Sequence, residues 1–313
     1  MLGRNAANLF WLSRYMERAE NMARLLDVAY RMAITAGTAG GGDHLRSMLQ
    51  AAAVDKLYDK KHAETALATV AHFMLFDREN PSSVGNCLLN ARSNARSVRV
   101  ALTQDMWSSL NDAWMEFERT RPNTITANRL PAFLGWIKQA AHQFRGALLS
   151  THLRNDGYCF AQFGNFIERG DNTARILDVK YYVLLPRSDP VGGEVDIHQW
   201  TMILRAASAH RSYRHVYHDR YRAFNIAEFL ILKREMPRSL AFCHDWIAST
   251  MIRLDGLYGE RTHSHDIVDR MGQTLFSQSM ESIFQSGLHE FLSDYIDQNS
   301  ALNQAIAVSY NFP

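Results

Sequence analysis

The first candidates for chemistry are charged and amide side chains near the start of the sequence. They recur three and four residues apart, so on a helix they share one face about 120° wide. They are Glu17, Glu20, Asn21, Arg24 and Asp27, with Arg18 at the edge of the opposite, apolar face. Carboxylates in such a row could bind a divalent cation, and arginines could hold a phosphate or carboxylate through paired hydrogen bonds. The spacing therefore marks a candidate polar site.

The same pattern occurs a second time in the chain. Residues 17–30 read ERAENMARLLDVAY and residues 168–181 read ERGDNTARILDVKY, with nine of fourteen positions identical at an offset of 151. The second set of candidates is therefore Glu168, Arg169, Asp171, Asn172, Arg175 and Asp178. A further match, RENPSSVGNC at 78–87 against REMPRSLAFC at 234–243, follows in the same order. Together they predict two repeats, at about 1–155 and 156–313.

The retained residue types predict that both polar faces are shielded from water, because exposed ion pairs contribute little and tolerate exchange. Two interpretations are open. In the first, the faces form a buried ion-pair and amide network that fixes how two helices pack. In the second, they line a site where carboxylates of both copies hold a divalent cation and Arg24 and Arg175 hold an anionic group. A solvated surface face is the remaining alternative.

A separate candidate is cationic. Arg92, Arg96 and Arg99 recur at i, i+4 and i+7 in a stretch expected to be helical, and the matching part of the second half retains only Arg253. Such a stripe suits an anion-binding site or an acidic partner. A salt-bridged helix face gives the same pattern, so both interpretations stay open.

Histidines and cysteines give weaker signals. His215 and His218 have a metal-like i, i+3 spacing, but the neighbouring arginines would repel a cation. Cys87, Cys159 and Cys243 include no CxxC pair, and we expect buried core thiols in a reducing compartment. The sequence has no GxSxG, P-loop or GxGxxG motif, so no catalytic residue is assigned and no cofactor is evident beyond the divalent cation considered above.

Composition narrows the class of protein. The chain has 313 residues, with 34 basic and 32 acidic side chains, so charge gives no reason to expect nucleic acid or a membrane surface as a partner. Apolar runs are too short to span a bilayer, and the N-terminus has no uninterrupted apolar leader. We therefore expect a soluble, cytoplasmic protein. Its basic residues comprise 28 Arg and 6 Lys, a bias that suits ion-pair networks and anion sites.

Helices are the elements that must position these residues. The segments with strong helix formers and three- and four-residue apolar spacing are 5–36, 62–76, 81–119, 126–155, 158–185, 196–231, 238–256 and 265–297. Pro81 and Pro237 are expected just inside helix starts, with Asn80 as an N-cap. The loop at 186–194 follows the first helix of the second repeat. We therefore predict an all-α, internally duplicated bundle whose halves interlock in one domain, 1–313.

These segments resemble the Alpha-E domain family, a bacterial all-helical family named for a Glu-Arg motif. The resemblance covers essentially the whole chain. It rests on NLFWLSRYMERAENMARLLDV near the start, RENP with NAR..AR..VR and W...N within 78–111, ERGDNTARILDVKYY at 168–182, PRS at 237–239 and GLHEFL at 287–292. By this resemblance Glu17-Arg18 and Glu168-Arg169 are the signature pairs.

The resemblance also implies a context. Alpha-E proteins are typically encoded beside, or fused to, an ATP-grasp protein and often a transglutaminase-like protein, and ATP-grasp enzymes form amide bonds through acyl phosphates. It therefore implies an accessory or partner-binding component of a peptide- or amide-forming system. Two alternatives remain. One is an enzyme, with or without Mg²⁺, that acts on an anionic substrate at a carboxylate and arginine site between the repeated helices. The other is a scaffold that bridges partner enzymes.

Overall fold

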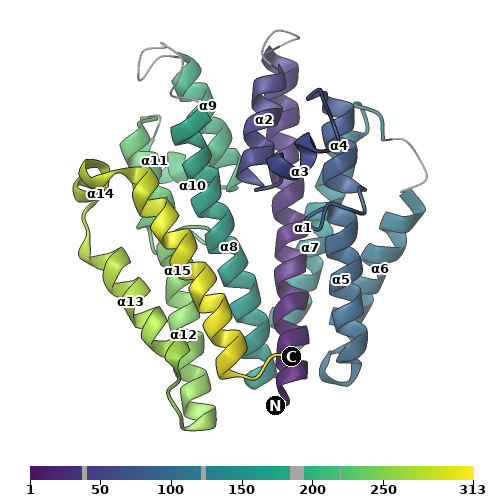
Figure 1. Cartoon of the computed structure of the whole chain (residues 1–313), viewed down its shortest axis with the longest axis vertical. Helices are drawn as coiled ribbons and strands as arrows, with labels where there is room; N and C mark the ends of the chain where they lie inside the picture. The colour runs from purple at the N-terminus through teal and green to yellow at the C-terminus, as the bar shows by residue number, and fades with distance from the viewer. Residues whose placement is uncertain (37–40, 121–124, 184–193, 219) are drawn as a thin grey trace. The chain divides into compact units, whose positions relative to one another are not determined.

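The computed structural model describes residues 1–36, 41–120, 125–183, 194–218 and 220–313. Across these ranges every regular element is helical, and the predicted all-α class is confirmed (Figure 1). The elements are α1 (Gly3–Ala36), α2 (Gly41–Ala51), α3 (Asp55–Asp59), α4 (Leu67–Leu75), α5 (Val84–Ser97), the 3₁₀ turn η1 (Arg99–Ala101), α6 (Gln104–Thr120), α7 (Leu130–Thr151), α8 (Asp156–Val183), α9 (Glu194–Ala206), α10 (His210–Tyr217), α11 (Ala223–Ile231), α12 (Leu240–Tyr258), α13 (His263–Ser277), α14 (Met280–Ser286) and α15 (Leu288–Ser309).

The chain divides into two compact units. The first comprises residues Met1–Glu168 with Tyr310–Pro313, and the second comprises Arg169–Ser309. The predicted repeats, about 1–155 and 156–313, and their union in one interlocked domain stay predictions. The predicted boundary loop at 186–194 falls almost wholly on residues 184–193, which lie outside the described ranges. None of the helices in the described ranges combines the length and apolar character needed to cross a bilayer.

In the first unit, α1 is the central helix. It packs against α2, α5 and α7, while α6 packs against α5 and α7 (Figure 1). Leu9, Phe10, Leu12 and Leu26 of α1 are completely buried. Because neighbours cover α1 on several sides, its polar face is also enclosed, which sets the environment of the candidate site.

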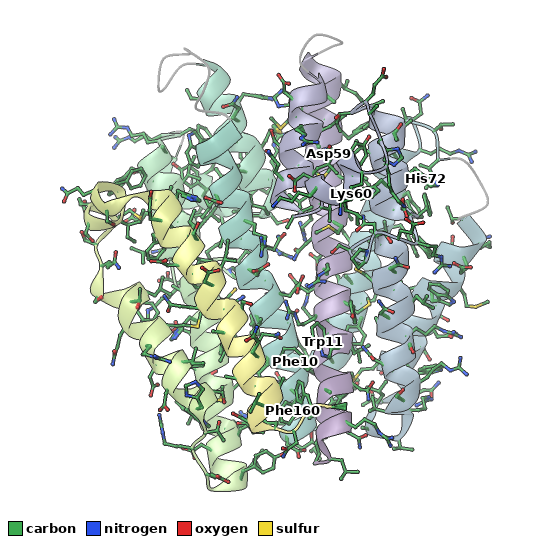
Figure 2. The ribbon with its side chains drawn as sticks, viewed as in Figure 1. Phe10, Trp11, Asp59, Lys60, His72 and Phe160 are labelled. Atoms are coloured by element: carbon green, nitrogen blue, oxygen red, sulfur yellow. The ribbon has the colours of Figure 1, made fainter. Side chains whose placement is uncertain are left out.

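The last residues of the chain close the lower end of the first unit. The ring of Phe312 lies 5.5 Å from that of Phe10 and 6.0 Å from that of Phe160, centroid to centroid. Figure 2 shows Phe10 on α1 and Phe160 on α8 at this end of the unit. The aromatic contacts hold the start of α8 against α1.

Gly164 lies where α8 approaches the backbone of α1. A Cβ atom at this position would overlap the carbonyl oxygen of Phe10 and lie 3.2 Å from the backbone nitrogen of Arg14. Backbone atoms cannot swing aside as a flexible side chain can. We therefore expect Gly164→Ala to lower the free energy of unfolding by about 2 kcal/mol, measured by urea denaturation.

Gly146→Ala on α7 is the matched control for this change. Nothing lies within 4 Å of the added Cβ there, so the better helix propensity of alanine should stabilise the protein by up to about 1 kcal/mol. Equal unfolding midpoints for the two variants would contradict the close approach of α8 to α1.

The second unit is built from the later part of α8 and helices α9 to α15. Helix α13 packs on α12 and α15, and α11 contacts α9, α10, α12 and α14 (Figure 1). Gly170 stands where the first copy of the motif has Ala19. A Cβ at Gly170 would lie 2.5 Å from the hydroxyl oxygen of Tyr295, so the packing of α15 on α8 explains this departure from the repeat.

Helix starts after Pro81 and Pro237 differ from the prediction. The N-caps are Ser83 and Ser239, whose Oγ atoms accept hydrogen bonds from the backbone N–H three residues on, at 3.3 and 3.0 Å. Asn80 is buried and donates to the carbonyl oxygen seven residues earlier, so its assignment as an N-cap is wrong. The prolines lie in the turn before each helix. The two matched serines have the same role in both units, as a duplication predicts.

Some helix boundaries also need correction. The predicted segments 81–119, 196–231 and 265–297 are each divided into two or three helices. Within 81–119, α5 ends at Ser97, and Thr103 begins α6 because its Oγ1 accepts a hydrogen bond from the N–H of Met106. Positive φ angles at Ser208, His218 and Gly287 turn the chain between the others. The pattern predicts no helix over residues 41–59, yet α2 and α3 form there.

Candidate functional site

The acidic face of α1 is covered by α7. The side chains of Glu17 and Glu20 are completely buried, and Arg145 of α7 bridges them. Its Nη2 donates to Glu17 Oε2 at 2.7 Å and also to Glu20 Oε2. Arg24, one turn along α1, donates from Nε to Glu20 Oε1 at 2.8 Å. Two carboxylates are thus held between two guanidinium groups and shielded from water, as the first interpretation of the pattern requires.

Helix α7 supplies two further basic side chains. His142 Nε2 lies 3.2 Å from Glu20 Oε1, and its side chain is 52% exposed. Lys138 Nζ donates to Asp27 Oδ2 at 2.9 Å. Since these residues and Arg145 recur at i, i+4 and i+7, a basic stripe of α7 runs antiparallel to the acidic stripe of α1. The sequence analysis did not identify this stripe, because its spacing marks a basic helix face without indicating which acidic helix that face covers.

Glu168 of α8 belongs to the first unit and pairs with arginines of α1. Arg18 donates from Nε to Oε1 at 2.6 Å and from Nη2 to Oε2 at 2.9 Å, and Arg14 Nε donates to Oε2 at 2.8 Å. Burial alone would raise the pKa of Glu168, but the charges and hydrogen bonds of Arg18 and Arg14 outweigh it and lower the pKa to about 2. Glu168 is therefore ionised at any physiological pH.

The later acids of the second copy lie in the second unit and are less enclosed. Arg175 Nε donates to Asp171 Oδ2 at 2.8 Å, with the side chains 34% and 21% exposed. Asp178 accepts from His289 Nδ1 of α15 at 2.5 Å when that nitrogen carries the proton. The predicted shielding therefore holds for Glu17 and Glu20 of α1, whereas Asp27 of α1 and the acids Asp171 and Asp178 of α8 are only partly shielded.

Two other residues of the second copy are buried. Arg169 Nη1 donates to the carbonyl oxygen of Pro237 at 3.3 Å, which ties α8 to the turn before α12. Asn172 is buried, as is its counterpart Asn21 on α1. In the second unit the motif thus contributes to packing around α12.

A small cavity adjoins the first site. Ser13, Glu17, Arg145 and Asn165 form its polar lining, and it has room for about one water molecule. The hydroxyl of Ser13 has no hydrogen-bond partner among the described residues, and its Oγ is buried. The space beside Glu17 therefore suits a water molecule and is too small for an organic substrate.

A comparison with models of protein families identifies the family of this chain. A family model matches residues 1–310, and the family is described as a predicted alpha-helical domain with a conserved ER motif. The chain belongs to the Alpha-E family. No curated protein and no solved structure matches it.

The two Glu-Arg pairs of this Alpha-E chain are used unequally. Arg18 of the first pair binds Glu168 of the second pair, so each copy contributes one partner to this ion pair, whose carboxylate is buried and whose guanidinium is 23% exposed. Glu17 instead faces Arg145, and Arg169 contacts a backbone carbonyl. At these contacts the motif joins α1 to α7 and α8, which is a structural use of its charges.

The arginine stripe of this Alpha-E chain is not one surface of one helix. Helix α5 ends at Ser97, so Arg99 lies in the 3₁₀ turn and the predicted i, i+7 relationship is wrong. Arg92 donates to Asn111 Oδ1 at 3.0 Å, and Arg99 donates to Gln104 at 2.9 Å with its guanidinium 5.0 Å from the Trp107 ring centre. Arg96 is exposed in the last turn of α5. Arg92 and Arg99 serve local packing, and anion binding by the three arginines together stays a prediction.

In the part of the chain that the structure describes, the cysteines and histidines considered from the sequence lie in environments that do not form a metal site. Cys87, Cys159 and Cys243 are free and buried, and burial raises the pKa of Cys87 to about 12, so the expectation of core thiols is confirmed. His215 lies on α10, but His218 follows its end with a positive φ. Within the described ranges, no three His, Cys, Asp or Glu side chains are grouped to hold a metal ion.

Proposed function

We propose that this Alpha-E chain is an accessory, partner-binding component of a bacterial, cytoplasmic system in which an ATP-grasp-type protein forms peptide or amide bonds. A transglutaminase-like protein is the second partner that the family resemblance implies. Three free, buried thiols are compatible with a reducing compartment.

The enclosure of the motif carboxylates carries the proposal. A catalytic acid, base or metal ligand must come within hydrogen-bond reach of its substrate. Glu168 is instead saturated by Arg14 and Arg18, and the cavity beside Glu17 has room for about one water molecule. These features favour a structural role for the motif. Binding to another protein would then use exposed side chains elsewhere on the chain.

One exposed apolar group in the first unit suits partner binding. Val100 is 99% exposed in η1, and Leu153 is 75% exposed just after α7. A hydrogen bond of 2.7 Å between the hydroxyls of Thr103 and Thr151 and one of 3.1 Å between the His152 ring and the Ala101 carbonyl oxygen tie these two turns together. Two large apolar side chains are therefore displayed on a braced surface, as an interface requires.

The first test is binding of an ATP-grasp-type protein from the same organism, the partner that the family resemblance implies. We expect the two purified proteins to form a complex, and the double change Val100→Glu with Leu153→Glu to raise its Kd at least about tenfold, because apolar anchors dominate interface energy. Titration calorimetry gives the Kd. Met115→Glu introduces the same charge at another exposed apolar side chain, on α6, and as the control it should leave the Kd unchanged.

Product formation by the complex distinguishes a partner-binding role from a catalytic site at the Glu-Arg motif. A folded Glu17→Gln variant should keep both the complex and its output, since Arg145 retains its ion pair with Glu20. Loss of output with the complex intact would instead support a catalytic site at the motif. Absence of any complex between the wild-type proteins would overturn the proposal.

A further inference from the structure

The second unit contains an open pocket that no part of the proposed function uses. Its volume is about 390 Å³, within the range of roughly 300–1,000 Å³ that is usual for small-molecule sites. One wall is α10, with Arg211, Ser212 and His215; the other consists of Lys233, Glu235 and Met236, which follow α11. All of these residues belong to residues 169–309, so the pocket is formed within one compact unit.

The floor of the pocket is apolar and preformed. Phe229 is 2% exposed and Met236 is 5% exposed, yet both line the pocket. Tyr213 and Tyr217 pack edge-on against Phe229, with ring centres 5.6 and 5.9 Å away. Because these rings pack against one another, the apolar floor is already ordered, and ligand binding would not cost the conformational entropy of ordering it.

The walls carry an excess of positive charge. Arg211 and His215 lie one turn apart on α10, and neither has a hydrogen bond or ion pair with another described residue. Among the described residues, Lys233 forms an ion pair with one acid, Glu235, at 3.4 Å. The Glu235 side chain is 75% exposed, so water screens its charge and it compensates little. An anionic group could therefore replace water at these cations.

A comparison of the two units shows what is specific to this pocket. At the offset of 156 that relates the proline motifs, Phe229 corresponds to Phe73 and Lys233 to Asp77. Phe73 also carries an edge-on tyrosine, Tyr58, at 5.2 Å. The aromatic scaffold thus recurs, whereas the charge at the rim is reversed.

In the first unit that rim position neutralises a cation. Asp77 Oδ2 lies 2.8 Å from Lys61 Nζ, and Glu79 adds a second carboxylate at 2.9 Å. In the second unit Lys233 replaces the acid, so positive charges gather around the aromatic floor without an enclosed counter-ion. Because of this reversal the positive charges of the pocket lack a buried counter-charge in the described part of the chain, and an anionic ligand would supply one.

We infer that this pocket binds a small organic anion, a phosphate or carboxylate on a compact apolar body. Arg211 and Lys233 hold the anionic group, and His215 supplies a further donor. The body lies on Phe229 and Met236. The inference is independent of the proposed partner-binding role, since the pocket needs no other protein.

Titration calorimetry of the full chain with phenyl phosphate tests the inference. We expect saturable binding of one equivalent, and an affinity at least about tenfold higher than for inorganic phosphate or phenol alone, since only the intact molecule meets both parts of the site. Benzoate in a parallel titration distinguishes a carboxylate from a phosphate preference. No ATP-grasp-type protein is present, so failure here leaves the proposed function untouched.

Variants locate the site. Arg211→Gln should weaken phenyl phosphate binding at least about tenfold, and Lys233→Asp, which restores the residue type of the first unit, should abolish it. Arg253→Gln on α12 removes an exposed cation that does not line the pocket and should change nothing. Circular dichroism checks the fold of each variant. Equal weakening by all three changes, or no saturable binding by the wild type, would overturn the inference.

Discussion

Arg145→Met is expected to lower the free energy of unfolding by about 3–5 kcal/mol, because it removes the guanidinium that bridges two completely buried carboxylates. Methionine keeps much of the length and apolar stem of arginine, so the loss reports charge more than packing. Glu17 and Glu20 would then repel each other in a site with little access to water. Urea denaturation at neutral pH, monitored by circular dichroism, measures the change.

A neighbouring ion pair on the same two helices provides the control. Lys138 pairs with Asp27, and their side chains are 23% and 15% exposed, so water retains access to both. Lys138→Met should therefore cost only about 1 kcal/mol. Adding Glu17→Gln to Arg145→Met removes one of the repelling charges and should recover part of the loss. Equal costs for Arg145→Met and Lys138→Met would contradict the buried network.

The class of fold could be predicted from the sequence because helix periodicity is a local signal. Most errors concern where helices stop. Thr103 caps a new helix within a stretch of strong helix formers, and Ser279 does the same before α14. A helix prediction that averages composition over many residues does not detect a single capping hydroxyl, although one hydrogen bond to that hydroxyl sets where the next helix begins.

Shielding of the α1 acids could also be predicted, because the repeat retains residue types that a solvated surface would exchange. The residues that pair with these acids could not be predicted from the sequence. The stripe of Lys138, His142 and Arg145 matches the acidic stripe in reverse order, as antiparallel helices require. Many helices of this chain carry basic residues, however, and only the tertiary arrangement selects α7 as the one that covers the acids.

The partner of Glu168 illustrates the same limit. Within its own helix, Arg175 is two turns away and pairs with Asp171 instead. The arginines that bind Glu168 lie 150 and 154 residues earlier, on α1. Spacing along one helix thus predicts pairs such as Arg24 with Glu20, but it carries no information about ion pairs between helices.

Glu168 should govern the acid stability of the protein. Its pKa is lowered to about 2 from an ordinary value of 4.5, so the folded state binds this proton less readily than the unfolded state. A depressed pKa gives stability that is complete above about pH 4.5 and is lost as the pH falls towards 2. The shift corresponds to about 3 kcal/mol. Glu168→Gln should forfeit this stability at neutral pH and leave Arg14 and Arg18 beside a neutral amide.

Urea denaturation of both proteins from pH 7 to pH 2 measures the effect. The gap between wild type and Glu168→Gln should be widest above pH 5 and narrow as Glu168 takes up its proton, because the wild type then loses the same charge. Asp59→Asn is the control, since Asp59 also pairs with an arginine, Arg46, but lies exposed where salt and water screen the pair. Its pH profile should follow the wild type. A constant gap at every pH would mean that Glu168 acts through its shape, and the arginine clamp around its charge would lose its role in stability.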